Sequence, residues 1–318
     1  MDYKDIKIVF FGTPDFAVES LKTLRDAGCD IRAVVTATDK PAGRGHKLLE
    51  SAVKQYAVAN NIPVLQPANL KSPEFQEELK AIDADLFIVI AFRMLPQSVW
   101  AMPRLGTFNV HGSLLPRYRG AAPINRAIMN GETKTGVSTF FLTHEIDTGD
   151  VIGKLETPIA DEDNAGTVHD RLMALGARLA LQTVKDIADG NVHPVAQSVL
   201  EQNNTPCPAP KIFKEDCRIN WNQEAKKVRD HIRGLSPYPA AWTIMHDGNE
   251  EITVKILDTA MTDKAASQPG RITVENGSMW VDCADTRLEV LSLQVQGKKR
   301  MSTADYLRGC RVIADTFI

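Results

Sequence analysis

The first two thirds of the chain alternate short apolar runs with segments whose apolar residues recur at helical spacing. Residues 6–11 are almost wholly apolar and predict a buried first strand. The apolar positions between Phe16 and Leu24 then recur at helical spacing, and Gly28 ends that pattern. This alternation is typical of βαβ units arranged around a mostly parallel sheet.

The same patterns predict the remaining elements of this region. Strands are expected at 31–36, 85–91, 107–110, 137–142 and 151–158. Helices are expected at 48–60, 72–82, 123–130 and 167–187. The predicted fold class is therefore α/β, with a Rossmann-like, mostly parallel sheet that carries helices on both faces.

The pattern changes after residue 190. Residues 203–210 are rich in asparagine and proline, a composition that does not sustain a helix and marks a domain boundary. Beyond it, a helix is expected at 225–233 and strands at 242–246, 252–257, 271–274, 279–283 and 288–295. Five short strands predict a small OB-like β-barrel. The expected organisation is a catalytic domain at 1–189, a linker at 190–208 and a C-terminal domain at 209–318.

Composition limits the class of protein more than its chemistry. The 318 residues are 43% hydrophobic and 24% charged, which excludes a disordered or fibrous chain. No apolar run approaches the roughly 20 residues that cross a bilayer, and the first residues are too charged for a signal peptide. A cytoplasmic protein without a membrane partner is expected. The five cysteines form no Cys-x-x-Cys pair, which indicates reduced thiols. The net charge of -3 leaves room for local basic clusters.

The densest group of polar residues surrounds the predicted strand at 107–110. Asn109 and His111 are two residues apart, so their side chains are expected on one face at the carboxyl edge of the sheet, where open α/β folds place their sites. Asp147 lies in a turn of the same sheet and is expected to reach the imidazole. The trio suits acyl transfer without a covalent enzyme intermediate, because no Gly-x-Ser-x-Gly elbow is present. On spacing alone, a purely structural role for these residues stays open.

Two basic segments indicate a polyanionic partner. Lys40, Arg44 and Lys47 lie in a glycine-containing loop without hydrophobic periodicity. Lys298, Lys299 and Arg300 follow the last predicted strand. Such clusters bind phosphates by releasing counterions, although each is also compatible with an ordinary solvated surface. Arg117 and Arg119 follow closely after His111, and their spacing alone does not assign them a ligand.

Cofactor and metal signals are missing from the sequence. The first turn lacks Gly-x-Gly-x-x-Gly, so no nicotinamide or flavin is expected. His144 has no second histidine at ligand spacing, so no metal is expected either.

The polar motifs resemble those of a known family. The run from Asn109 to Pro116 and the later Asp147-Thr148-Gly149-Asp150 are similar to the signature of 10-formyltetrahydrofolate-dependent formyltransferases. The resemblance implies that Asn109, His111 and Asp147 form the catalytic trio. It also implies a folate site made of Ser113, Leu114, Leu115, Pro116, Phe92 and Leu95. The segment 91–96 is one residue shorter than in many relatives.

Other segments resemble one branch of this family almost from end to end. Residues 11–17, 40–47, 209–212 and 297–301 are similar to those of methionyl-tRNA formyltransferases. That resemblance implies transfer of a formyl group from 10-formyltetrahydrofolate to the α-amine of initiator methionyl-tRNA, by a monomer. It assigns tRNA binding to Lys40, Arg44, Lys47, Lys298, Lys299 and Arg300.

The chain departs from the family pattern at two further places, and three alternatives remain. Residues 144–146 replace a more usual glycine-leucine approach to the aspartate, and Tyr238 stands where tryptophan is common. Formyltransferases that act on glycinamide ribonucleotide normally lack the barrel, and those that act on sugar-nucleotide amines do not require the basic loop. A nonenzymatic RNA-binding protein would leave the Asn109, His111 and Asp147 arrangement unexplained.

Overall fold

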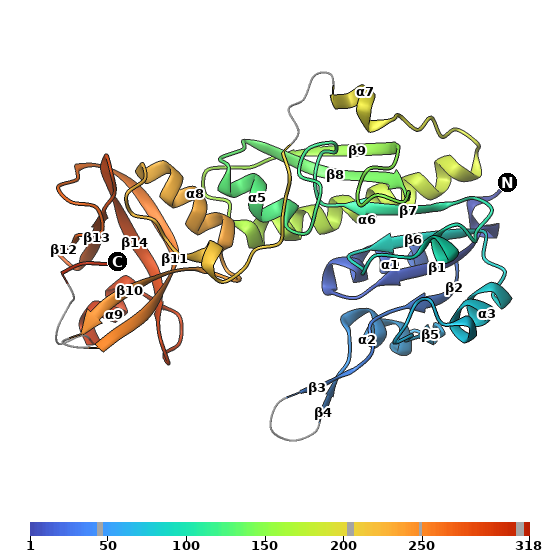
Figure 1. The fold of residues 1–318 in the computed structure, drawn as a ribbon, viewed down its shortest axis with the longest axis horizontal. Helices are drawn as coiled ribbons and strands as arrows, with labels where there is room; N and C mark the ends of the chain where they lie inside the picture. The colour runs from blue at the N-terminus through green and yellow to red at the C-terminus, as the bar shows by residue number, and fades with distance from the viewer. Residues whose placement is uncertain (43–46, 202–206, 248–249, 310–314) are drawn as a thin grey trace. The chain divides into compact units, whose positions relative to one another are not determined.

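A computed structural model describes residues 1–42, 47–201, 207–247, 250–309 and 315–318 of the chain (Figure 1). The chain divides into two compact units. Unit 1 comprises Met1–Gly120, Gly136–Thr157 and His169–Pro208, and unit 2 comprises Ala121–Thr135, Pro158–Val168 and Ala209–Ile318. The backbone therefore passes from one unit to the other five times. The functional division at 1–189, 190–208 and 209–318 stays a prediction.

Unit 1 is built on a seven-stranded sheet in the order β5-β2-β1-β6-β7-β8-β9. The strands are β1 Lys7–Gly12, β2 Asp30–Val35, β5 Val64–Leu65, β6 Leu86–Ile90, β7 Thr107–His111, β8 Lys134–Phe141 and β9 Val151–Pro158. The first five are mutually parallel, and β8 runs antiparallel to β7. Each residue from Ile8 to Phe11 is 0% exposed, as expected for a parallel strand that is covered on both faces.

Helices cover the two faces of this sheet. They are α1 Asp15–Asp26, α2 Ala52–Ala59, α3 Pro73–Ala81, α4 Gln97–Trp100, α6 Ala165–Ala188 and α7 Gln197–Glu201, with a 3-10 turn at Tyr3–Asp5. Phe75 of α3 belongs to one apolar cluster with Phe11 and Phe87. On the other face, Gly176 of α6 lies against Val110 of β7. Asn109 and His111 alternate with Val110 along β7, so they point to the face opposite α6.

One predicted helix boundary is wrong. The helix expected over 48–60 begins only at Ala52, because Lys47–Leu49 form β4, which pairs with β3 at Lys40–Ala42. Ser51 then caps α2 by accepting a hydrogen bond from the backbone N–H of Lys54. The β3–β4 ribbon extends away from the seven-stranded sheet (Figure 1). Residues 43–46 lie outside the described residues.

The ends of the β3–β4 ribbon are tied to α2 by Lys54. Its ammonium group pairs with Asp39, which precedes β3, and lies 3.0 Å from the carboxylate of Glu50, which follows β4. Gln66 adds a 2.8 Å hydrogen bond to the second carboxylate oxygen of Asp39. The Lys54 side chain is only 16% exposed, so one half-buried cation holds both ends of the ribbon.

The C-terminal part of unit 2 is an antiparallel β domain with the strand order β10-β11-β14-β13-β12, and β15 also pairs with β14. The strands are β10 Ala241–Asp247, β11 Glu250–Ala265, β12 Ile272–Glu275, β13 Ser278–Asp282, β14 Thr286–Val295 and β15 Met301–Ser302. Near the chain's end, Phe317 bridges to Met245 of β10 and Thr316 bridges to Arg271 beside β12. The predicted α/β fold class with a mostly parallel sheet is confirmed, and the domain predicted as a small OB-like β-barrel is an antiparallel β domain.

Three helices complete unit 2: α5 Pro123–Met129, α8 Ala225–Leu235 and α9 Thr303–Gly309, with a 3-10 turn at Glu215–Cys217. The first two pack closely at Gly234, where an added Cβ would lie 2.6 Å from a Met129 side-chain carbon. The Asn125 amide also donates to the Gly234 carbonyl at 2.8 Å. A segment from the middle of the sequence is therefore an integral part of the C-terminal unit.

A buried carboxylate fastens the β domain. Asp282 is 0% exposed and accepts hydrogen bonds from the backbone N–H groups of Ser267 and Gln268, at 2.6 and 3.1 Å, and from Arg287 Nε at 2.6 Å. Burial by itself raises the pKa of Asp282, but these donors outweigh it and hold the pKa below its ordinary value. The ionised carboxylate is therefore the form that stabilises the fold.

Candidate active site

Asn109 and His111 lie two residues apart at the end of β7, and their side chains share the face of the sheet opposite α6. Asn109 is paired in register with Val89 and Phe140, and His111 with Ser138. The His111 residue is 7% exposed, and its ring meets the Phe140 ring edge-on at a centroid distance of 6.5 Å. Asn109 is partly buried, and its amide has no hydrogen-bond partner among the described residues. An amide in that state can donate to, or accept from, a bound substrate.

The His111 ring is oriented by a backbone carbonyl. Its Nε2 lies 2.8 Å from the carbonyl oxygen of Tyr118, whereas Nδ1 lies 3.9 Å from Asp147 Oδ2. A carbonyl only accepts hydrogen bonds, so Nε2 carries a proton and the neutral ring has a defined tautomer. From the sequence, Asp147 is expected to reach the imidazole, but at 3.9 Å it makes no hydrogen bond to the ring. In the structure, Nδ1 on the Asp147 side is the nitrogen left to exchange a proton.

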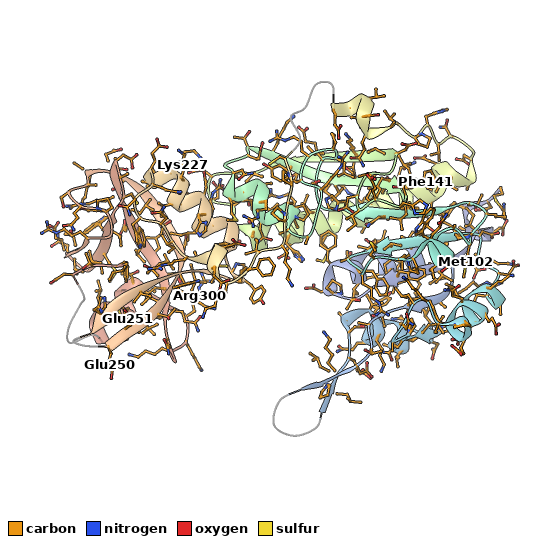
Figure 2. The ribbon with its side chains drawn as sticks, in the orientation of Figure 1. Met102, Phe141, Lys227, Glu250, Glu251 and Arg300 are labelled. Atoms are coloured by element: carbon orange, nitrogen blue, oxygen red, sulfur yellow. The ribbon has the colours of Figure 1, made fainter. Side chains whose placement is uncertain are left out.

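Asp147 lies in the connection between β8 and β9, which runs over residues 142–150. Its Oδ2 accepts a hydrogen bond from the Gly120 backbone N–H at 2.9 Å, and its backbone has a left-handed φ of 56°. At Gly149, an added Cβ would overlap the carbonyl oxygen of Phe141 at the end of β8, so only glycine fits (Figure 2 labels Phe141). The 3.9 Å separation from His111 is too long for a hydrogen bond, but charges interact strongly at that distance in a buried site.

The segment 113–116 is held directly against the sheet. The Ser138 hydroxyl donates to the Ser113 carbonyl at 2.7 Å and accepts from the Leu115 N–H at 3.0 Å. The Lys154 ammonium donates to the Leu115 carbonyl, and burial lowers the pKa of Lys154. Ser113, Leu115 and Pro116 are buried, whereas Leu114 is only partly buried. The backbone of this segment is thus fixed beside His111.

Phe92 and Leu95 lie in the segment that follows β6, the strand next to β7. Phe92 packs edge-on against Phe11 with ring centroids 5.7 Å apart, and Leu95 is 5% exposed within the cluster formed with α3. The carboxyl ends of β6 and β7 share one edge of the sheet, so this segment and residues 113–116 lie along the same edge.

Four of the six predicted basic residues are exposed: Lys40, Lys298, Lys299 and Arg300. Lys40 is exposed in β3, Lys47 belongs to β4, and Arg44 lies outside the described residues. Lys298, Lys299 and Arg300 are exposed in the turn between β14 and β15, where Arg300 (labelled in Figure 2) donates to the Ser292 hydroxyl at 3.0 Å.

Sequence reasoning missed Gln197. It lies in the segment 190–208, which was expected to be a linker, yet it is 2% exposed and its amide donates to the carbonyls of Asp147 and Gly149 at 2.8 Å each. No local pattern marks it, because its partners are about 50 residues away. Arg119, whose role the spacing left open, binds Gln197 and Glu201.

The described parts of the chain hold neither a candidate metal site nor a candidate membrane span. No group of three or more His, Cys, Asp or Glu residues there could hold a metal ion. The His144 ring instead meets the Trp100 ring edge-on at 5.6 Å. Within the same residues, no helix has the length and apolar character needed to span a membrane.

Comparison with known proteins identifies the family. Residues 6–184 match the family described as Formyl transferase, and residues 211–311 match the family described as Formyl transferase, C-terminal domain. The methionyl-tRNA formyltransferase of Bacteroides thetaiotaomicron is 53% identical over 315 residues, covering 98% of each chain. That of Parabacteroides distasonis is 52% identical over 321 residues, covering 99% of each.

Solved structures show the same fold at lower identity. An N-formyltransferase from Helicobacter canadensis, in complex with folinic acid and dTDP-3-aminofucose, matches 93% of this chain and 100% of its own, with a TM-score of 0.64 and 20% identity. A HypX variant from Aquifex aeolicus matches 97% of this chain with a TM-score of 0.65 and 17% identity, and this chain spans about half (49%) of its length. The two family matches and the full-length similarity at above 50% identity together place this chain in the formyl transferase family, among relatives that are methionyl-tRNA formyltransferases.

Proposed function

We propose that this chain transfers the formyl group of 10-formyltetrahydrofolate to the α-amino group of initiator methionyl-tRNA, in the cytoplasm where translation begins. The observation that carries the proposal is the convergence of Asn109, His111 and Asp147 at the end of β7 in a member of the formyl transferase family. The choice of acceptor is supported by full-length relatives named methionyl-tRNA formyltransferases.

In the proposed reaction, the amine nitrogen forms a bond to the formyl carbon, and the bond from that carbon to the folate nitrogen breaks. The unused Asn109 amide donates a hydrogen bond to the formyl oxygen as negative charge develops there. His111 in its protonated form donates from Nδ1 to the same oxygen. Asp147 stabilises the imidazolium and accepts the proton that leaves the amine, and that proton then passes to the departing folate nitrogen.

The residues beside the trio fit a folate. A pterin ring requires a flat apolar contact together with hydrogen bonds from fixed polar groups. Leu114 offers a partly buried apolar side chain on a backbone that Ser138 and Lys154 hold in place. Phe92, which is partly buried, adds apolar surface along the same edge of the sheet, and Leu95 belongs to the buried cluster against which Phe92 packs. We assign Ser113, Leu114, Leu115, Pro116, Phe92 and Leu95 to folate binding within this proposal.

The basic residues are assigned to the tRNA. Lys40 and Lys47 belong to strands β3 and β4, and Arg44 lies between them in the sequence. Lys298, Lys299 and Arg300 belong to the β14–β15 turn. Each cation that neutralises a phosphate steepens the salt dependence of binding. Replacing Arg44 by alanine should therefore raise the KM for tRNA and flatten its salt dependence, with an unchanged KM for folate. The enzyme is expected to act as a monomer.

A labelled-formyl assay tests the proposal with three acceptors in parallel: charged initiator tRNA, glycinamide ribonucleotide and an amino sugar nucleotide. Transfer to the tRNA is expected, with losses of about 10² to 10³ in single-turnover rate for Asn109→Ala, His111→Ala and Asp147→Asn. Transfer only to one of the two small acceptors would show that this molecule, and not the tRNA, is the acceptor. Near-native rates for all three variants would contradict the assignment of these residues to catalysis.

A further inference from the structure

Gln197 joins three separate parts of the chain around Asp147. It is the first residue of α7 and is 2% exposed. Its Nε2 donates to the carbonyl oxygens of Asp147 and Gly149, at 2.8 Å each. Its Oε1 accepts from Nε and Nη2 of Arg119, at 2.9 and 2.7 Å. Both N–H donors and both acceptor positions of this amide are therefore used.

Helix α7 is also linked to the Asp147 carboxylate through Arg119 and Gly120. Arg119 also pairs with Glu201, which lies four residues after Gln197 on α7, at 2.7 Å. The residue after Arg119 is Gly120, whose N–H binds Asp147 Oδ2. Through Gln197, α7 thus holds the backbone of the catalytic turn directly, and through Arg119 it holds the donor that orients the carboxylate.

The turn needs such support because its own sequence favours other conformations. Asp147 is not a glycine, yet it has a left-handed backbone conformation with φ 56°. The preceding residues 144–146 are exposed. Two buried N–H donors aimed at the carbonyls on either side of Thr148 fix the backbone there, and they thereby fix where the Asp147 side chain begins.

We propose that Gln197 is a positioning residue for the formyl transfer reaction: its amide sets the distance between the Asp147 carboxylate and His111. The α7 segment, which the sequence predicts to be part of a linker, is then a functional part of the active site. This inference rests on the proposed catalytic role of Asp147. A displacement of about 1 Å in a catalytic group can cost on the order of 10²-fold in rate.

Two substitutions separate the contacts of Gln197. Gln197→Glu keeps acceptor oxygens for Arg119 but offers no donor to the two carbonyls, whereas Gln197→Ala removes both sets. Each should lower the single-turnover rate about 10- to 100-fold while changing the KM for tRNA and for folate less than about threefold. Gln182→Ala is the matched control, since Gln182 is an exposed α6 residue that bonds only Asp186 among the described residues. Rates near that of the control for both Gln197 variants would overturn the inference.

A double-mutant cycle distinguishes positioning from a general structural role. In an Asp147→Asn background, Gln197→Ala should lower the rate less than about threefold further, because the carboxylate that it positions is already gone. An equal loss in both backgrounds would show that Gln197 acts elsewhere and would overturn the inference alone. A native rate for Asp147→Asn by itself would instead overturn the proposed role of Asp147, and this inference with it. Circular dichroism and thermal unfolding identify any variant that fails to fold. If Gln197→Ala does not fold, the inference is tested with the transfer rate of Gln197→Glu, which keeps the Arg119 contact.

Discussion

Replacing Asp147 by asparagine removes a charge but keeps the shape and the hydrogen bond from Gly120. Asp147 Oδ2 and His111 Nδ1 are 3.9 Å apart, and their side chains are 11% and 8% exposed. With an effective dielectric constant of about 20, the attraction between a carboxylate and an imidazolium at this distance is about 4 kcal/mol. Most of this attraction is present only in the transition state, where His111 is protonated. Its loss should therefore lower the transfer rate by about 10² to 10³. The KM values should change little, because ground-state binding does not use the interaction.

The assay is single-turnover formyl transfer to charged initiator tRNA at saturating folate, at several salt concentrations. Glu145→Gln is the control, since it also removes one carboxylate from the same turn but from an exposed side chain. The loss in Asp147→Asn should persist at high salt, because both side chains are nearly buried. A loss of less than about threefold, or one equal to that of the control, would refute the electrostatic reasoning.

Three further predictions concern residues that support the site and the fold. Gly149→Ala places a methyl group on a backbone carbonyl, so the turn must move, and the transfer rate should fall at least about tenfold; a native rate would contradict the close approach. Lys54→Met releases Asp39 and Glu50 at the ends of the β3–β4 ribbon and should raise the KM for tRNA severalfold without changing that for folate; equal changes in both would contradict a tRNA-specific role. Asp282 has a lowered folded-state pKa, so its stabilisation is present above its ordinary pKa of about 4 and is lost as the pH falls through the folded value. Asp282→Asn should therefore lower the free energy of unfolding at pH 7 by about 3 kcal/mol, measured by urea unfolding. It should also flatten the dependence of that free energy on acid pH. A free energy of unfolding that falls with pH in parallel with that of the wild type would contradict this prediction.

The fold could be predicted from the sequence wherever one residue pattern dominates. The run from Ile8 to Phe11 is so apolar that only a strand buried on both faces accommodates it. Five of the six strands described in the C-terminal domain are likewise predicted, from short strand-like runs with the turn dipeptides Asp247-Gly248 and Asn276-Gly277 between them. The apolar pair Leu48 and Leu49 accounts for the wrong helix boundary, because apolar residues next to a helix suggest its first turn. In the structure both side chains are exposed on β4, at 62% and 63%.

The site was predictable only in part, for a different reason. The spacing of Asn109 and His111 on one strand fixes their common face, and Asp147 follows from the turn between two strands of the same sheet. The carbonyl of Tyr118 and the amide of Gln197 could not be predicted, since a backbone atom and a distant side chain leave no local pattern. Their roles arise only when the chain has folded.

The close packing of α5 against α8 has a consequence for how the chain is made. Residues 121–135 leave the ribosome about a hundred residues before α8, yet Gly234 and Met129 meet within unit 2. The earlier segments of that unit cannot pack against α8 until synthesis is almost finished, and their apolar surface stays uncovered until then. A shortened product that stops near residue 208 would never acquire that cover. Such a fragment should be a poor substitute for the whole enzyme and a ready substrate for chaperones and proteases, whatever the state of its catalytic residues.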